Sequence, residues 1–465
     1  MRYVSTRGQA PSLGFADTVL AGLASDGGLY VPEDYPNLSN DELGALRGTS
    51  YADVATRVIA PFVGDDIPHD QLKRMIAEAY ATFAHPAVAP LVQMGANSWM
   101  MELHHGRTLA FKDVAMQLLA RLMDHILTER NQRATIVGAT SGDTGGAAID
   151  AFAGRERTDV FILFPNGRVS DVQRRQMTAN GASNVHAVAV EGDFDDCQAI
   201  VKSMFGDGGF REEVALSGVN SINWARIVAQ VVYYVTASLA LGGPQRAVSF
   251  CVPTGNFGDV FAGYVAERMG LPIERLVVAT NDNDLLDRTL ATGRYERRPV
   301  VQTTSPSMDI AVSSNFERLL FDANERDASE VRAAMDGLAQ SGGFTIKDSA
   351  IERMRGLFAA GMCDQRTAAS RIERTLRQTD IMVDPHTAVG LEVAERHAGS
   401  APMVTLATAH AAKFPAAVRD AIGREPEVPP RLAGLMERDE RYDTLPNALR
   451  AVQDYIRERT RAVMA

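Results

Sequence analysis

Residues Ala134–Phe152 read ATIVGATSGDTGGAAIDAF, an apolar run followed by a glycine-rich turn and a helical period. A run that is apolar throughout, instead of alternating, is typical of a parallel strand covered on both faces. Similar apolar runs recur at Asp159–Pro165, Val185–Val190, Ala247–Val252, Arg275–Thr280 and Met403–His410, with helical periods such as Asp171–Asn180 and Asp195–Phe205 between them. This strand–helix alternation predicts an α/β protein with parallel sheets flanked by helices.

The region 315–380 interrupts this alternation. It carries no strong strand signal, and Phe316–Leu338 has apolar residues at helical spacing with charged residues on the opposite face. We therefore expect a helical insertion there, in which Phe316–Leu338 is a packing helix with one solvated face. The breaker Gly242-Gly243-Pro244 precedes a new strand and indicates a return between two lobes.

Composition and charge exclude several classes of protein. The chain has 465 residues, of which 46% are hydrophobic and 23% charged, so it can build two or three domain-sized cores. A net charge of −11 argues against a general binder of nucleic acid or acidic membranes. The three cysteines are too few and too scattered for a disulfide framework or a zinc site, and no stretch is long enough to span a bilayer. We expect a reduced, cytoplasmic protein.

One lysine, Lys112, opens an amphipathic helix inside the apolar stretch Leu109–Asp113, LAFKD. Hydrocarbon surroundings disfavour the ammonium form, so a buried lysine loses its proton readily and becomes an amine nucleophile. A lysine that forms a Schiff base needs this property. The alternative is a lysine whose stem packs while its head reaches water.

The segment Val252–Asp259, VPTGNFGD, follows one predicted strand and precedes a helical run at Val260–Met269. Its glycines allow backbone N–H groups to converge at a helix start, where the helix dipole adds partial positive charge, so the segment predicts a phosphate site. It lacks the lysine of a Walker loop and the third glycine of a dinucleotide fingerprint. A plain tight turn is the alternative.

Two further polar segments stand at predicted helix starts. The hydroxyls and N–H groups of Ala139–Gly146, ATSGDTGG, suit a carboxylate ligand, while Ser141 or Asp143 is also suited to cap the helix. The segment Asn220–Arg226 places amides, a hydroxyl and a guanidinium within two helical turns. A guanidinium is well shaped for a phosphate, whereas the structural alternative is a helix start capped by Ser221 or Asn223.

Thr408 lies at the end of the last strong strand, where ligands of parallel sheets bind. The neighbouring His410, like His386, is interpreted as a hydrogen-bonded structural residue and not as a catalyst. The sequence contains no metal-ligand spacing, no nucleophile elbow and no basic patch with interleaved aromatic residues. The candidate site therefore consists of a lysine and several polar turns.

These segments together resemble one enzyme family, the threonine synthases of the longer bacterial and fungal type. By this resemblance the chain would fall within the pyridoxal-phosphate enzymes shaped like tryptophan synthase β, the fold type II group. The matching segments are Gly22–Pro32 (GLASDGGLYVP), Thr108–Asp113 (TLAFKD), Ala139–Gly145 (ATSGDTG), Asp193–Gln198 (DFDDCQ), Asn220–Arg226 (NSINWAR), Pro253–Asp259 (PTGNFGD) and Thr408–Phe414 (TAHAAKF). Their joint order and spacing carry the resemblance, which runs nearly end to end.

The resemblance implies roles for individual residues, with Lys112 as the catalytic residue that carries pyridoxal phosphate as a Schiff base. The cofactor-binding residues implied with Lys112 are Gly255, Asn256, Phe257, Gly258 and Asp259 at the phosphate, Thr408 at the pyridine nitrogen, and Asp143 where related enzymes often carry Asn near the 3′-oxygen. The substrate-binding residues implied are Thr108, Thr140, Ser141 and Thr144 toward the carboxylate, and Asn220, Ser221 and Arg226 toward a phosphate. Ala411 stands where the family pattern has proline, and Thr254 where it has serine.

The resemblance also implies an architecture and a reaction. We expect two α/β lobes behind an N-terminal subdomain, divided as 1–95, a smaller domain at 96–225 and a larger one at 226–465. The expected reaction turns O-phospho-L-homoserine and water into L-threonine and phosphate by γ-elimination and β-addition of water, which makes the chain a carbon–oxygen lyase acting on phosphates. It would work as a monomer or homodimer. The alternatives are a serine or threonine dehydratase-like lyase of the same fold and a non-catalytic pyridoxal-phosphate-binding protein.

Overall fold

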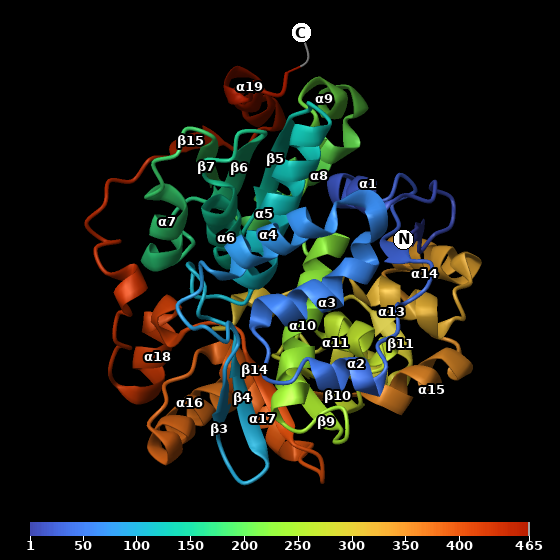
Figure 1. Ribbon diagram of the computed structural model, residues 1–465. Helices are drawn as coiled ribbons and strands as arrows, with labels where there is room; N and C mark the ends of the chain where they lie inside the picture. The colour runs from blue at the N-terminus through green and yellow to red at the C-terminus, as the bar shows by residue number, and fades with distance from the viewer. Residues whose placement is uncertain (464–465) are drawn as a thin grey trace.

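Two sheets form the centre of the molecule in the computed structural model, which describes residues 1–463 (Figure 1). The larger sheet has, in spatial order, β13 (Phe358–Met362), β10 (Ile273–Thr280), β9 (Val248–Pro253), β14 (Met403–Ala407), β4 (Ser98–Glu102) and β3 (Leu91–Gln93). The smaller sheet has β15 (Asp443–Pro446), β7 (Val185–Glu191), β6 (Thr158–Pro165), β5 (Ala134–Ala139) and β8 (Leu216–Ser217). Neighbouring strands in both sheets are parallel, except that β3 and β4 are antiparallel.

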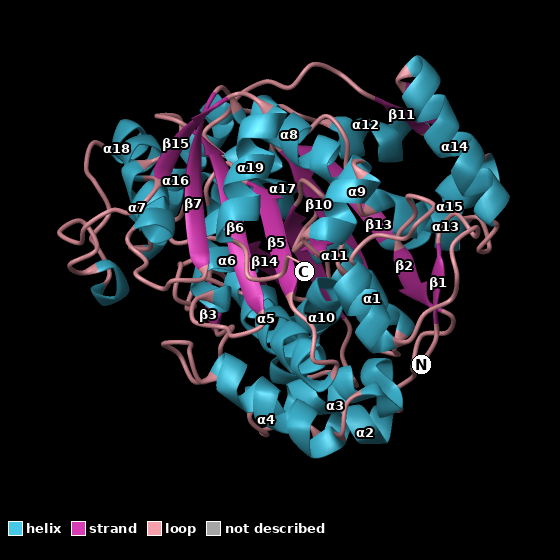
Figure 2. Cartoon of the chain, turned by 90° about the horizontal axis from the view of Figure 1, so that it is seen from above, coloured by secondary structure: helices cyan, strands magenta, loops and turns pink. Residues whose placement is uncertain are grey.

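Helices surround the two sheets (Figure 2). Before the first strand of the smaller sheet come α1 (Phe15–Ala21), α2 (Asn40–Ala45), α3 (Tyr51–Val63), α4 (His69–Tyr80) and α5 (Lys112–Glu129). They are followed by α6 (Asp143–Phe152), α7 (Asp171–Thr178), α8 (Phe194–Gly206), α9 (Gly208–Glu213), α10 (Trp224–Ala240), α11 (Gly258–Arg268) and α12 (Leu285–Thr292). The last are α13 (Phe316–Ala323), α14 (Ala328–Ser341), α15 (Asp348–Leu357), α16 (Gln365–Thr379), α17 (Pro385–Arg396), α18 (Pro415–Ile422) and α19 (Leu449–Arg459). Within residues 1–463, no helix combines the length and the apolar character that a bilayer crossing requires.

The predicted α/β class with parallel-rich sheets is confirmed. Every apolar run that the sequence predicts to be a strand is a strand, and all side chains of β6 and β9 are buried. The helix α10 is also buried on nearly every side, because α3, α5 and α11 pack around it. A helix that is apolar all round is stable only in such a position.

The structure corrects the prediction for residues 315–380 in two respects. The expected single helix Phe316–Leu338 is two helices, α13 and α14, because Glu325 and Arg326 adopt left-handed backbone angles, with φ of 56° and 65°. The region also contains two strands. β13, with the sequence FAAGM, pairs with β10 at the edge of the larger sheet, and β12 (Gly343–Thr345) pairs with β11 (Arg294–Glu296). Small residues and a glycine gave β13 little strand signal of its own.

Membership of the two sheets does not follow the order of the chain. The strand β4 lies in the larger sheet beside β14, although residues 96–225 were predicted as the smaller domain. The strand β15 and the helix α19, from the predicted larger domain at 226–465, instead complete the smaller sheet. The boundary at residue 95 separates β3 from its antiparallel partner β4. Parallel strands are joined by long crossovers, so neighbours in space need not be neighbours in sequence.

A loop of the N-terminal region closes on Asp26. Its carboxylate accepts hydrogen bonds from the Ser5 hydroxyl at 2.8 Å and from the backbone N–H groups of Gln9, Ala10 and Gly28 at 2.8–2.9 Å. A β carbon at Gly28 would lie 2.3 Å from Ser5 Oγ. The loop therefore requires glycine at this position, which explains one glycine of the segment GLASDGGLYVP.

We predict that Gly28→Ala destabilises the protein by about 2 kcal/mol, because the added methyl group must displace Ser5 from Asp26. The urea midpoint of unfolding measures this loss. Gly356→Ala in α15 is the matched control, since no atom lies within 4 Å of its β carbon, and we expect its midpoint to stay or rise slightly. Equal midpoints for Gly28→Ala and the unaltered protein would contradict the prediction.

Candidate active site

Lys112 is the first residue of α5, and a backbone connection to the end of β14 fixes its position. The N–H of Phe111 donates a 2.8 Å hydrogen bond to the carbonyl of Thr408, and Ala110 forms an isolated bridge with Ala409. Lys112 is 9% exposed, and its Nζ lies 3.4 Å from Ser307 Oγ, to which it donates a hydrogen bond. The head of the lysine is thus buried, which contradicts the alternative of a head that reaches water.

Burial lowers the pKa of Lys112 below its usual value. The carboxylate of Asp143, whose Oδ2 lies 3.7 Å from Nζ, opposes this effect, whereas the positive charges of Arg226 and Lys413 reinforce it. The net result is a pKa below that of an ordinary lysine, so Lys112 loses its proton more readily than an exposed lysine does. Desolvation and neighbouring charges thus give Lys112 the electronic character that a nucleophile or proton acceptor needs.

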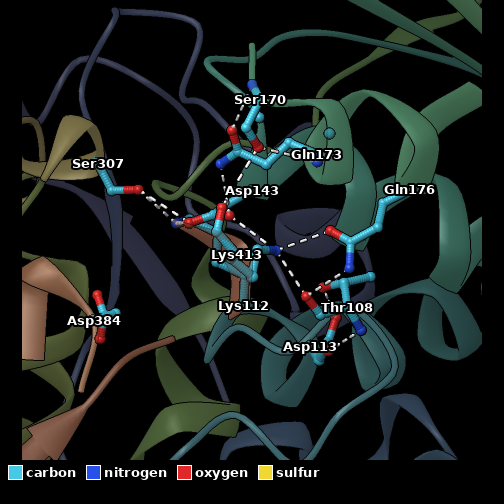
Figure 3. Close-up of polar contacts among 12 residues, drawn as sticks. Thr108, Lys112, Asp113, Asp143, Ser170, Gln173, Gln176, Ser307, Asp384 and Lys413 are labelled. Carbon is cyan, nitrogen blue, oxygen red and sulfur yellow. Dashed lines mark hydrogen bonds and ion pairs between the residues drawn. The ribbon is translucent and has the colours of Figure 1, made fainter. Parts of the chain in front are cut away.

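Asp143 begins α6, and its carboxylate is the centre of a buried polar cluster (Figure 3). Its Oδ1 lies 2.9 Å from Nζ of Lys413 and accepts a 3.1 Å hydrogen bond from Gln173, while its Oδ2 accepts a 3.3 Å bond from the hydroxyl of Ser307. Burial by itself would raise the pKa of Asp143, but the ammonium groups of Lys413 and Lys112 hold it far below its usual range. Asp143 is therefore a carboxylate at neutral pH.

Lys413 connects Asp143 to the segment that leads into α5. It ends the 3₁₀ turn Ala411–Lys413, and its Nζ donates to the carbonyl oxygen of Thr108 at 2.7 Å and to Oε1 of Gln176 at 3.0 Å. The hydroxyl and the N–H of Thr108 both donate to Asp113 at 2.7 Å. The side chain of Thr108, predicted to bind substrate, is therefore already committed to the start of α5.

In the turn Gly255–Gly258, carbonyl oxygens accept hydrogen bonds from the protein, while the N–H groups stay free. The hydroxyl of Ser313 donates to the carbonyl of Gly255 at 2.6 Å, and Asn315 donates to the carbonyl of Asn256 through its backbone and its side chain. The backbone N–H groups of residues 255–258 find no acceptor within the described part of the chain. We call these free N–H groups at the start of α11 the anion cradle, because N–H groups at a helix start favour an anion; that a phosphate binds there stays a prediction.

The turn is also coupled to the N-terminal region. The guanidinium of the fully buried Arg318 hydrogen-bonds to Oδ1 of Asn315 and donates a 3.0 Å bond from Nε to the carbonyl of Tyr30 in β2 (Tyr30–Pro32). The same Asn315 donates to Asn256 at 2.9 Å. A continuous polar chain therefore runs from β2 to the anion cradle.

Asp259 follows the cradle but faces away from it. Its Oδ1 accepts hydrogen bonds from Tyr233 at 2.5 Å and Tyr234 at 3.0 Å, both on α10, and burial raises its pKa to about 6. Its carboxylate thus fixes α11 against α10. Any contribution of Asp259 to the predicted phosphate site has to come from its backbone N–H group.

The turn after β5 differs from the expected capping pattern. The hydroxyl of Thr140 accepts the N–H groups of Gly142 and Gly145 at 2.9 Å, so Thr140 closes the turn and neither Ser141 nor Asp143 caps α6. The predicted cap was wrong because Gly142, with φ of 138°, occupies the cap position of α6, and the hydroxyl of Thr140 accepts the N–H groups of the turn instead. Within residues 1–463, the hydroxyls of Ser141 and Thr144 make no hydrogen bond and remain free to contact a ligand.

The structure gives the residues of the predicted site at 220–226 different roles. Asn223 caps α10 by accepting the N–H of Ala225 at 3.1 Å, which confirms the structural alternative for that residue. Arg226 is 3% exposed and donates only to the carbonyl of Val219, while its Nε has no partner in the described chain. Burial lowers the pKa of Arg226 to about 10. Asn220 is exposed, so of this group Arg226 alone is a buried, incompletely paired cation.

Two histidines have the structural roles that the sequence predicts. His410 accepts the N–H of Ala412 at 3.1 Å through Nδ1. His386 lies 2.7 Å from Asp384 through Nδ1, and its Nε2 accepts the backbone N–H of Ser307 at 3.2 Å. His386 therefore helps to place Ser307 beside Lys112. Thr408 is buried at the end of β14.

Comparison with known proteins places the chain in a family. Three family models match it: "Threonine synthase N terminus" over residues 2–80, "Pyridoxal-phosphate dependent enzyme" over 85–364 and "Threonine synthase, C-terminal" over 387–456. The threonine synthase of Pseudomonas aeruginosa is 51% identical over 459 residues, which cover 98% of each chain. The chain belongs to the threonine synthase family. The family and the cofactor class predicted from the sequence are thus confirmed.

Solved structures of this family have the same fold. The crystal structure of pyridoxal-phosphate-bound threonine synthase from Brucella melitensis is 62% identical, with a TM-score of 0.98, and the match covers 99% of this chain and all of that one. Yeast threonine synthase is 37% identical with a TM-score of 0.93, and the match covers 98% of both chains. The fold type II architecture with an N-terminal region is therefore shared with family members.

We predict that Gly255→Ala weakens the binding of pyridoxal phosphate roughly ten- to a hundred-fold, because a β carbon there would lie 2.7 Å from the carbonyl oxygen of Ser307 and would distort the cradle. Absorbance titration of the apoprotein with the cofactor measures this affinity. Gly95→Ala, whose β carbon meets only ordinary contacts, should bind as the unaltered protein does. Unchanged affinity of Gly255→Ala would show that the phosphate lies elsewhere.

Proposed function

We propose that this chain converts O-phospho-L-homoserine and water into L-threonine and phosphate, acting as a carbon–oxygen lyase on a phosphorylated substrate. The observation that carries the proposal is the grouping of a buried lysine with a lowered pKa, a cradle of free backbone N–H groups and a buried arginine whose Nε has no partner among the described residues. Membership of the threonine synthase family supports the same reaction. We further propose a cytoplasmic enzyme that works as a monomer or homodimer.

The residues present fit pyridoxal phosphate. The cradle at 255–258 supplies N–H groups for its phosphate, Lys112 supplies the amine for covalent attachment, and the hydroxyl of Thr408 is suited to face the pyridine nitrogen. When bound, the cofactor supplies an electron sink for negative charge at the substrate's carbon atoms. Lys112 then accepts and returns protons at the α and β carbons of the substrate, which its low pKa permits.

The substrate would be held by its two charged ends. The free hydroxyls of Ser141 and Thr144 stand at the start of α6, where helix N–H groups and the dipole favour a carboxylate. We assign the substrate phosphate to Arg226, because an anion there would complete the unfilled hydrogen bonding of its guanidinium. Ser221 lies half-buried nearby in sequence and extends this site toward Asn220 at the surface.

Thr140 and Thr108 support the substrate site indirectly. The Thr140 hydroxyl shapes the turn that carries Ser141, and the Thr108 hydroxyl fixes Asp113 at the start of α5. Both side chains are buried and hydrogen-bonded within the protein. We therefore assign them to positioning the groups that touch substrate.

We expect Lys112→Ala to lose threonine formation by roughly 10³-fold or more, because the variant lacks the amine that attaches the cofactor and moves the protons. Coupled assays of phosphate and threonine release from O-phospho-L-homoserine measure the loss. Lys202→Ala, at an exposed position of α8, is the control for an unspecific effect of removing a lysine. Substantial threonine formation by folded Lys112→Ala would contradict the assignment of Lys112.

A second substitution separates the proposed reaction from that of a dehydratase of the same fold. We expect Arg226→Gln to lower kcat/KM for O-phospho-L-homoserine roughly ten- to a hundred-fold while cofactor binding is retained, because one charged contact to the phosphate is lost. Deamination of serine and threonine is measured in parallel. Faster deamination of these amino acids than turnover of the phosphorylated substrate by the unaltered protein would favour the dehydratase alternative.

A further inference from the structure

Two buried lysines share one buried carboxylate in this site. Nζ of Lys413 lies 2.9 Å from Oδ1 of Asp143, and Nζ of Lys112 lies 3.7 Å from its Oδ2 (Figure 3). Lys413 is fully buried and Lys112 nearly so. One carboxylate cannot neutralise two ammonium groups, and an unpaired ammonium in such surroundings is costly. The two lysines therefore compete for the charge of Asp143.

The hydrogen bonds decide this competition in favour of Lys413. Its Nζ has three acceptors, namely Oδ1 of Asp143, the carbonyl oxygen of Thr108 and Oε1 of Gln176. An ammonium group has three N–H donors, so three acceptors match the protonated form. Within the described residues, Lys112 donates only to Ser307, at 3.4 Å, and its 3.7 Å approach to Asp143 is longer than a hydrogen bond.

We propose that Lys413 is a positioning residue that serves as the permanent counter-ion of Asp143 and thereby leaves the Lys112 amine free to react in its neutral form. This rests on the proposed function, because it gives Lys413 a task in preparing Lys112 for the cofactor. Lys413 acts through Asp143 and forms no bond in the reaction. Without Lys413, Asp143 would have Lys112 as its nearest cation, and that pair would hold Lys112 as ammonium.

The neighbouring charges change the pKa of Lys112 in the directions that this role requires. Burial is the main reason for the low pKa of Lys112, Asp143 opposes it, and the positive charge of Lys413 adds to it directly. Removal of Lys413 would take away one effect that lowers the pKa and would strengthen the one that raises it. Among the described residues, the other charged or titratable groups that act on this cluster are Asp113 on α5, Arg226 on α10, Asp259 on α11 and His386 on α17.

The experiment follows the reaction of the apoprotein with pyridoxal phosphate as a function of pH. The Lys112 nitrogen attacks the aldehyde carbon, a carbon–nitrogen double bond forms and one water leaves, so the rate rises as Lys112 loses its proton. Absorbance gives the rate, and borohydride reduction followed by peptide mass analysis identifies the lysine. The midpoint is the pH at which the rate reaches half of its maximum. We expect Lys413→Met to raise this midpoint by about one to three pH units, because Asp143 then pairs with Lys112.

Matched variants separate charge from structural support. Lys413→Arg keeps the charge and should bring the midpoint back toward that of the unaltered protein. The double variant Lys413→Met with Asp143→Asn removes both charges and should lie below Lys413→Met, whereas Asp143→Asn alone should move the midpoint downward. Gln176→Ala removes a contact of Lys413 without removing a charge and should leave the midpoint in place. If Lys413→Met does not fold, two expectations remain: Lys413→Arg should keep the midpoint near that of the unaltered protein, and Asp143→Asn should lower it.

Two results would overturn the role of Lys413. One is an unchanged midpoint in folded Lys413→Met or Asp143→Asn, and the other is an equal shift in Gln176→Ala, which would reduce Lys413 to structural support. An unaltered protein that forms no covalent bond with pyridoxal phosphate at any pH would overturn the proposed function and this role together. If the unaltered protein reacts normally with pyridoxal phosphate and the variants have the same midpoint, only the role of Lys413 is overturned.

Discussion

A buried carboxylate must be fully partnered, and Asp143 meets this requirement with side chains from four separate segments. Lys112 begins α5, Gln173 lies in α7, Ser307 stands in the loop before α13, and Lys413 follows β14. The helices α5 and α7 both pack against α6, whereas Lys413 follows β14 and the backbone of Ser307 is held by His386 of α17. Removing a partner would leave charge uncompensated in the interior. This one carboxylate therefore fixes how the two lobes meet around Lys112.

Much of the fold could be predicted because its central strands are long and apolar on both faces. The strands β5, β6, β9 and β10 have this pattern, and each was found from the sequence. Short strands such as β4 and β13 form because they pair with the neighbouring strands β14 and β10, and not because their own residues strongly favour a strand. Such tertiary effects override local propensity, and they also place β4 and β15 in sheets that the order of the chain does not indicate.

The sequence predicted those parts of the candidate site in which a residue type is unusual for its surroundings, as Lys112 is in an apolar stretch. Ser307 was missed because its short 3₁₀ turn, Pro306–Met308, carries no recognised motif and is held at the site by the backbone hydrogen bond to His386. Gln173 was missed because its sequence signal is that of a capping box with Ser170, which predicts a helix start only. Residues that act through long-range contacts leave little trace in local sequence, so the partners of Asp143 became visible only in three dimensions.

The polar chain from Tyr30 through Arg318 and Asn315 to Asn256 gives the N-terminal region a share in ligand binding. An anion seated on the cradle stabilises the conformation that Asn315 imposes, and by linkage it also stabilises the docking of β2. The apoprotein should therefore open this region more often than the loaded protein does. Loss of the cofactor would then make the N-terminal segment more accessible to proteases, so occupancy of the cradle would protect a part of the chain that does not touch the ligand.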